Sequence, residues 1–165
     1  MSTIGIIGAG QAGSVLAQAL IDAGHRVVVA NSRTPRSLDD LVRHLGPRAS
    51  AAWAADAAAE ADIAFLGFPY APDTDLPAAE LAGKIVLDNN NYMVWRDGNI
   101  AAIDTGAVTV HELRQQQLPA SRIVKAFSHV QFHPRFTIRS DVDSVRRRQA
   151  PRAAPPRPSS RGARP

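Results

Sequence analysis

The chain has 165 residues, no cysteine and a formal net charge of +4 at pH 7. This length predicts one domain with a buried core, and the lack of cysteine excludes disulfides, thiolate zinc sites and cysteine nucleophiles. The positive charge is local: residues 1–136 hold 11 Lys and Arg against 13 Asp and Glu, whereas residues 137–165 hold 8 Arg and 2 Asp. We therefore expect no nucleic-acid-binding face on the folded body.

The chain starts at Met1 and runs directly into an apolar strand, without the cationic and long apolar segments of a signal peptide. No later run has the length needed to cross a bilayer. We therefore expect a soluble, cytoplasmic protein without membrane contact.

The first predicted unit is a strand over residues 3–7, a glycine-rich turn, and a helix over residues 14–23. Three glycines in the turn follow the G-x-G-x-x-G spacing. The first allows a tight turn, the second lets a pyrophosphate approach the backbone, and the third lets the helix pack closely on the strand. The alternative is that these glycines are purely structural.

A helix that starts at such a turn can bind phosphate through its first backbone N–H groups and its positive dipole end. Gly24 ends the predicted helix, and residues 26–30 form a second apolar strand, so the unit is a complete βαβ. The predicted phosphate-binding residues are Gly8, Gly10, Gln11, Ala12 and Gly13.

The turn after the second strand indicates which dinucleotide binds. NAD sites usually carry an acid here that binds the ribose 2′-hydroxyl. This chain has no carboxylate in residues 31–36 but has two hydroxyls and two guanidiniums, which suits a 2′-phosphate. We predict NADP, with a solvated polar turn as the alternative. The predicted residues are Asn31, Ser32, Arg33 and Arg36.

The remaining pattern predicts alternating helices and strands. A capping box over Ser37–Asp40 would start a helix, and Thr109 would start another over residues 110–118. Six strands that alternate with helices favour an α/β fold with a doubly wound parallel sheet. The other predicted elements are an edge strand at 49–52, helices at 53–61 and 76–81, and strands at 63–68, 84–88 and 122–127.

Three loops would follow strands at the carboxyl edge of the sheet, where open α/β sheets bind ligands. They start at Pro69, Asn89 and Ser128. The amides of residues 89–91 could bind a ligand, although asparagine also fills ordinary turns. His129 could supply a proton, because an imidazole exchanges protons near neutral pH, but it could equally be a polar residue that closes a strand. His129 and His133 lack a third ligand, so we expect no metal site.

Residues 137–165 lose the apolar periodicity and are rich in Arg and Pro. We predict a disordered basic tail there, after a nucleotide-binding domain of residues 1–136. Binding of an anionic partner by this tail is the alternative to a segment without function.

Several of these motifs together resemble the NADPH:coenzyme F420 oxidoreductase family. The resemblance covers roughly residues 1–134 and implies a Rossmann fold. Its most specific parts are the Ser-Arg turn and the Val-Lys-Ala-Phe strand. The motifs that carry it are Ile4–Gly10, Asn31–Arg33, Asp88–Tyr92, Arg96–Gly98 and Arg122–Phe127.

The resemblance implies that a hydride passes between NADP(H) and a deazaflavin (coenzyme F420) or flavin-like acceptor, chemistry that the cofactors carry and the protein orients. Family members have a dimer contact, so the resemblance allows a homodimer. By this resemblance, the 2′-phosphate lies at Ser32 and Arg33, the nicotinamide side at Phe68 and Pro69, and the acceptor pocket at Asn89 and Asn90.

Two features depart from the family pattern. Ser128 stands where family members commonly have Asn, and the Arg/Pro-rich segment stands where they continue into helical structure that completes the acceptor pocket. Because Arg, Pro, Ala, Ser and Gly are specified by GC-rich codons, we hypothesise that residues 137–165 are an out-of-frame reading of a longer gene. Translation of the other two frames tests this hypothesis.

The sequence therefore favours an NADPH-dependent oxidoreductase with a small-molecule hydride acceptor. The alternatives are a non-catalytic NADP(H)-binding module or an inactive remnant of the enzyme. A nucleic-acid binder that uses the basic tail ranks last, because the body carries no basic stripe.

Overall fold

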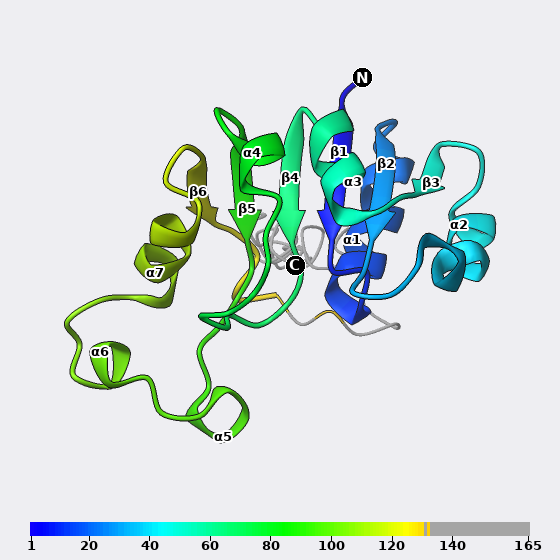
Figure 1. Ribbon diagram of the computed structural model, residues 1–165. Coiled ribbons are helices and arrows are strands. Elements are labelled where there is room, and N and C mark those ends of the chain that lie inside the picture. Colours follow the sequence, from blue (N-terminus) through cyan, green and yellow to red (C-terminus); the bar gives the residue numbers. More distant parts are fainter. Residues whose placement is uncertain (131, 133–165) are drawn as a thin grey trace, which may run out of the picture.

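The computed structural model describes residues 1–130 and 132. In this part of the chain, six strands form one sheet in the order β3-β2-β1-β4-β5-β6 (Figure 1). All five pairings are parallel, which confirms the predicted doubly wound sheet. The strands are β1 (Thr3–Ile7), β2 (Arg26–Ala30), β3 (Ala49–Ala51), β4 (Ile63–Leu66), β5 (Ile85–Asp88) and β6 (Arg122–Lys125).

Helices connect the strands. Figure 1 shows α3 and α4 in front of the sheet and α1 behind it, so both faces are covered. The segments are α1 (Gln11–Asp22), the 3-10 helix η1 (Pro35–Leu38), α2 (Asp39–Leu45), α3 (Ala54–Glu60), α4 (Ala78–Leu81), α5 (Val94–Asp97), α6 (Ala101–Asp104) and α7 (Val110–Gln117).

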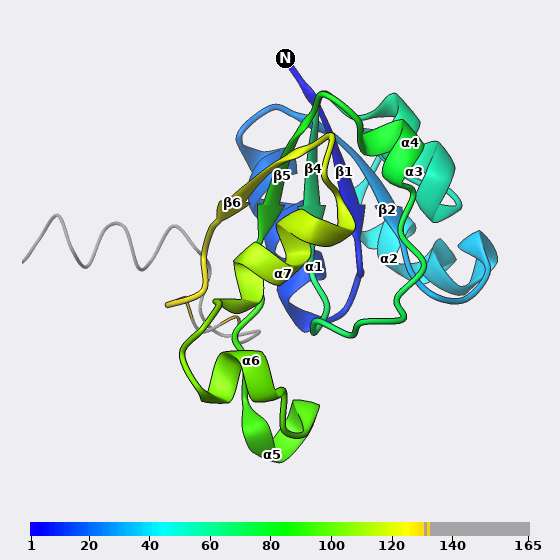
Figure 2. The ribbon, with the colours of Figure 1, turned by 60° about the vertical axis from the view of Figure 1, so that its left-hand side comes forward.

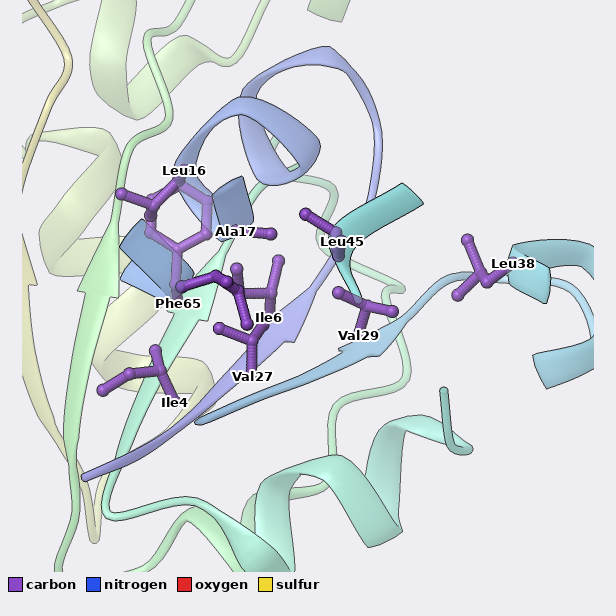
Figure 3. Packing of buried hydrophobic residues seen from close by; sticks show 10 residues of the cluster. Ile4, Ile6, Leu16, Ala17, Val27, Val29, Leu38, Leu45 and Phe65 are labelled. Carbon is purple, nitrogen blue, oxygen red and sulfur yellow. The ribbon is translucent and has the colours of Figure 1, made fainter. Parts of the chain in front are cut away.

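The core has one layer on each side of the sheet. Alternate residues of β1 and β2 pack with α1 in the first layer, as Figure 3 shows for Ile6, Val29 and Leu16. The second layer contains Ile7 of β1 and Leu81 of α4. Because a central parallel strand is buried on both faces, β1 and β2 must be apolar at nearly every position, which is the pattern that predicted them.

Some predicted boundaries were wrong. The helix α1 begins at Gln11, three residues before the predicted start, so the glycine turn passes directly into it. The capping box at Ser37 does not form: the Ser37 hydroxyl donates to the carbonyl oxygen of Thr34, and α2 begins at Asp39 without a side-chain cap. The last strand ends at Lys125, before Phe127 takes a left-handed backbone with φ of 58°.

The helices α5 and α6 were not predicted. They form an arm that extends away from the sheet, as Figure 2 shows. The predicted tail at 137–165, the boundary at residue 136 and His133 lie outside the described residues. Within the described residues, no helix is long and apolar enough to span a membrane.

Candidate nucleotide-binding site

The turn between β1 and α1 is a close-packed backbone junction. Gly8 has a φ of 100°, a conformation that favours glycine, and a β-carbon built on it would lie 2.9 Å from the backbone of Gly67. A β-carbon on Gly13 would lie 2.2 Å from the carbonyl oxygen of Gly8. Two of the three glycines are therefore required by packing, as the spacing predicted.

Gly10 differs from the other two glycines. It is exposed, and a β-carbon built on it would have no atom within 4 Å. Gly10 is also the N-cap of α1, which has no side-chain cap and no acidic residue in its first turn. The positive end of α1 is therefore open to an anion that approaches past Gly10.

The helix α7 shows the contrast. There Thr109 accepts a hydrogen bond from the Glu112 N–H, and the Glu112 carboxylate accepts one from the Thr109 N–H. A helix start that carries its own carboxylate has no need of an external anion, whereas α1 has none of its own.

The polar turn after β2 lies beside the glycine turn. The N–H groups of Gly8 and Ala9 both donate to the carbonyl oxygen of Ala30, the last residue of β2. Asn31 shapes the turn: its Oδ1 accepts the N–H of Arg33, and its Nδ2 donates to the hydroxyl of Ser37. The two predicted binding regions are therefore neighbours at one edge of the sheet.

The guanidiniums of this turn face solvent. Ser32, Arg33 and Arg36 are exposed, and neither arginine forms an ion pair or a side-chain hydrogen bond with the described residues. Asn31, in contrast, is engaged within the turn, so its predicted role is one of shaping the backbone rather than offering a free amide.

A cavity, which we call the inner pocket, lies at the carboxyl ends of β4 and β5. It has a volume of about 220 Å³. Its lining includes six residues that the sequence singled out, Ala12, Phe68, Pro69, Asn89, Asn90 and Asn91, and three that were not predicted, Gly67, Met93 and Arg96. The lining joins the start of α1 to the loops after β4 and β5, so a ligand at the glycine turn can continue into it.

Asn90 lines the inner pocket and carries an unused hydrogen-bond donor. It is 4% exposed, and its Nδ2 has no hydrogen-bond partner within the described residues. Its own N–H donates to Oδ1 of Asp88, which fixes the backbone. Because a buried amide N–H group costs free energy when it is left unpaired, this atom indicates a site for a ligand acceptor.

Arg96 closes one side of the inner pocket. Its Nη2 donates to the carbonyl oxygen of Asn91, and the guanidinium also pairs with Asp97. The hydrogen bonds from Arg96 hold the pKa of the Asp97 carboxyl below its usual value, against the effect of burial. The Arg-Asp-Gly run of residues 96–98, noted only as a family motif, was the available signal for this residue.

The prediction that His129 could supply a proton gains no support from the geometry. His129 is exposed and is not part of the lining of the inner pocket. Ser128 contributes its carbonyl oxygen, which accepts a hydrogen bond from Asn91 Nδ2. Among the described residues, no group of three His, Cys, Asp or Glu side chains is placed to hold a metal ion.

A six-stranded parallel sheet in this order, with a glycine turn after its first strand and an open helix start, defines the Rossmann class of dinucleotide-binding folds. The chain belongs to a family within that class, described as NADP oxidoreductase coenzyme F420-dependent, whose model matches residues 3–92.

Solved structures agree with this family. One is a candidate F420-dependent NADP reductase from Arthrobacter sp. FB24, with 27% identity and a TM-score of 0.62 over 76% of this chain and 61% of that chain. A hypothetical protein from Sinorhizobium meliloti has 32% identity and a TM-score of 0.60 over 77% and 62%. This chain thus matches about three fifths of the length of each.

A more distant likeness extends to the fold alone. An imine reductase from Myxococcus stipitatus, solved with NAD⁺, has 22% identity and a TM-score of 0.52 over 74% of this chain and 39% of that chain. No curated protein sequence matches the chain.

Proposed function

We propose that this chain binds NADP(H) and orients it for hydride transfer to a deazaflavin or flavin-like acceptor. The observation that carries the proposal is the continuity of three features along one edge of the sheet: an exposed pair of arginines, an open helix start and a pocket with an unpaired amide. A dinucleotide with a 2′-phosphate has matching groups in the same order.

Different residues are assigned to the three parts of NADP(H). The guanidiniums of Arg33 and Arg36 bind the 2′-phosphate, aided by the hydroxyl of Ser32. The first N–H groups of α1 bind the pyrophosphate, which approaches over Gly10. The unpaired Nδ2 of Asn90 donates to an acceptor atom on the nicotinamide half, for which the carboxamide oxygen is suited.

When bound, NADPH supplies the hydride, and the acceptor supplies the second ring. The chain's contribution is to hold the nicotinamide half in the inner pocket and leave one ring face accessible. Phe68 and Pro69, from the loop after β4, and Asn89–Asn91, from the loop after β5, line that pocket, and we call these two loops its Phe68 wall and its Asn90 wall. No side chain is required to transfer a proton in this arrangement, so His129 has no assigned role.

Calorimetric titration of NADPH and NADH tests the cofactor assignment. The wild type should bind NADPH more tightly than NADH, and Arg33→Ala should lose about 1.5–3 kcal/mol toward NADPH, the scale of a charge-assisted hydrogen bond. Arg43→Ala is the matched control, because Arg43 is also exposed but pairs with Asp40 on α2. Absence of NADPH binding by the wild type would refute the proposal.

Oxidation of NADPH then distinguishes an enzyme from a binding module. Coenzyme F420, FMN and FAD would each be offered as acceptor, and the absorbance of NADPH followed. A turnover that saturates with one of them supports the oxidoreductase. Binding of NADPH without turnover of any acceptor would assign the non-catalytic module instead.

A further inference from the structure

Arg114 is a fully buried arginine outside the lining of the inner pocket. Its side chain, on α7, is 0% exposed, and so is that of its partner Asp88, with Nε 3.4 Å from Oδ2. Burial lowers the pKa of the Arg114 guanidinium, while Asp88 opposes that change. A buried ion pair often contributes little net stability compared with an apolar pair. Stability alone therefore does not explain why Arg114 and Asp88 are buried together.

Arg114 contacts the loop after β4. The guanidinium carbon lies 5.1 Å from the ring centroid of Phe68 and 5.3 Å from that of Tyr70, within the range of a cation–π interaction. Nη1 donates to Oε1 of Gln117, and Gln117 Nε2 in turn donates to the carbonyl oxygens of Ala71 and Pro72. Arg114 therefore holds the loop after β4 in two ways, by contact with its aromatic rings and by hydrogen bonds through Gln117.

The same arginine reaches the loop after β5 through Asp88. While Oδ2 of Asp88 pairs with Arg114, Oδ1 accepts the N–H of Asn90. Phe68 and Asn90 stand on the two walls of the inner pocket. Arg114 is thus joined to both walls, to one directly and to the other through a single carboxylate.

We propose that Arg114 is a positioning residue that holds the Phe68 and Asn90 walls of the inner pocket in register, and so orients the nicotinamide half of the dinucleotide. This inference rests on the proposed binding of NADP(H). The planar guanidinium suits the role, because it presents a flat face to the aromatic rings and donors in its plane to Asp88 and Gln117. A lysine would keep the charge and lose this geometry.

The test compares two ligands that share the adenosine half. NADPH and adenosine 2′,5′-bisphosphate both carry the 2′-phosphate, but only NADPH reaches the inner pocket. In Arg114→Lys, the Kd for NADPH should rise about tenfold, the equivalent of about one hydrogen bond, whereas the Kd for the bisphosphate should stay within about twofold. The exposed Arg122→Lys is the control and should change neither value.

A second variant covers the case in which Arg114→Lys does not fold. Gln117→Ala removes the tie to Ala71 and Pro72 and leaves the buried ion pair intact. It should weaken NADPH binding about threefold and leave the bisphosphate unchanged. This pattern separates positioning from loss of stability, which would weaken both ligands alike.

The outcomes are distinct. The role of Arg114 would be overturned if the Kd values of both ligands changed equally, or if the Kd for NADPH changed in neither variant. The cofactor assignment would still stand in both cases. A wild type that binds neither ligand would overturn the proposed function, and this inference with it.

Discussion

Gly13 lies with its α-carbon against the carbonyl oxygen of Gly8, so closely that a β-carbon on Gly13 would stand 2.2 Å from that oxygen. The same oxygen would lie 2.6 Å from a β-carbon on Gly67, at the end of β4. Three backbone segments therefore meet at one point: the turn after β1, the start of α1 and the end of β4. This junction sets the position of the helix start that we assign to the pyrophosphate.

Gly13→Ala should destabilise the fold. The methyl group would press on backbone atoms, which cannot move aside without shifting α1 from the sheet, and overpacking of this kind costs about 1–3 kcal/mol. Urea denaturation would measure the loss. An unchanged midpoint would show that α1 can slide along the sheet to accommodate the methyl group.

Gly10→Ala should leave the free energy of unfolding nearly unchanged, because a methyl group there meets no atom within 4 Å and the backbone φ is −79°. The methyl group would instead occupy the space through which the pyrophosphate approaches, so NADPH binding should weaken about tenfold or more. Parallel denaturation and calorimetry of Gly10→Ala and Gly13→Ala measure both effects. Normal NADPH binding by Gly10→Ala would place the pyrophosphate elsewhere.

Thr109→Ala should destabilise the chain by about 1 kcal/mol, because Thr109 caps α7 and its loss leaves the Glu112 N–H unpaired. Thr105→Ala is the control. Thr105 is the C-cap of α6, and its hydroxyl donates to the carbonyl oxygen of Ala101 instead of capping a helix start. Chemical denaturation should give a clearly smaller loss for the control. Equal losses of unfolding free energy in the two variants would mean that the hydrogen bond from the Glu112 N–H to Thr109 does not contribute more than the one at Thr105.

The βαβ unit could be predicted from the sequence because its signals are local. An apolar run, a glycine spacing and a second apolar run follow each other within residues 3–30, and each agrees with the next. Thr109 was likewise predicted to start a helix, and it does so, with a capping box to Glu112 that lies three residues further on. Ser37 had the same kind of local pattern, but its hydroxyl is taken by Thr34 and Asn31, a competition that the cap pattern does not reveal.

The inner pocket was only partly predictable. Asn90 drew attention because it belongs to a run of three asparagines that follows a strand, and its role as a cofactor contact stays a prediction. Arg114 gave no such signal: it lies in a short, polar helix whose residues read as solvent-facing. Its burial depends on Phe68 and Tyr70, more than 40 residues earlier in the chain, so only the folded structure brings it to the site.

Lys84→Met should destabilise the fold by about 1 kcal/mol. The Nζ of Lys84 donates to the carbonyl oxygens of Ala58 and Ala59, near the C-terminal end of α3, where cations are favourable. Lys125→Met, at the chain's other lysine, is the control because that side chain is exposed. Thermal unfolding measures the difference. Equal melting temperatures of the two variants would refute the contribution of these bonds.

His111 should make the fold less stable as the pH falls below neutrality. Burial lowers the pKa of this imidazole from its ordinary value of 6.5, and Lys125 and Arg114 act in the same direction while Asp88 opposes them. Its Nε2 is buried without a partner among the described residues, so the neutral ring is the form the fold accepts.

The sign of the effect follows from proton uptake. Below pH 6.5 the unfolded chain binds a proton at this residue before the folded chain does, so acid favours unfolding. The loss of stability is small above pH 6.5, grows as the pH falls, and stops growing once the folded imidazole is also protonated. The carboxyl pKa values of Glu112 and Asp97 are lowered from 4.5 and 3.8. Protonation of these two groups therefore reduces the stability of the fold only at more acidic pH than protonation of His111.

Melting temperatures at about pH 7.5 and about pH 5.5 would measure this dependence, since histidine is the side chain that ordinarily titrates between them. His111→Gln should show a smaller drop between the two pH values than the wild type, because the residue can no longer take up a proton in the unfolded chain. His44→Gln, at an exposed position on α2, should keep the wild-type drop. An equal drop in the wild type and His111→Gln would assign the acid sensitivity to another group.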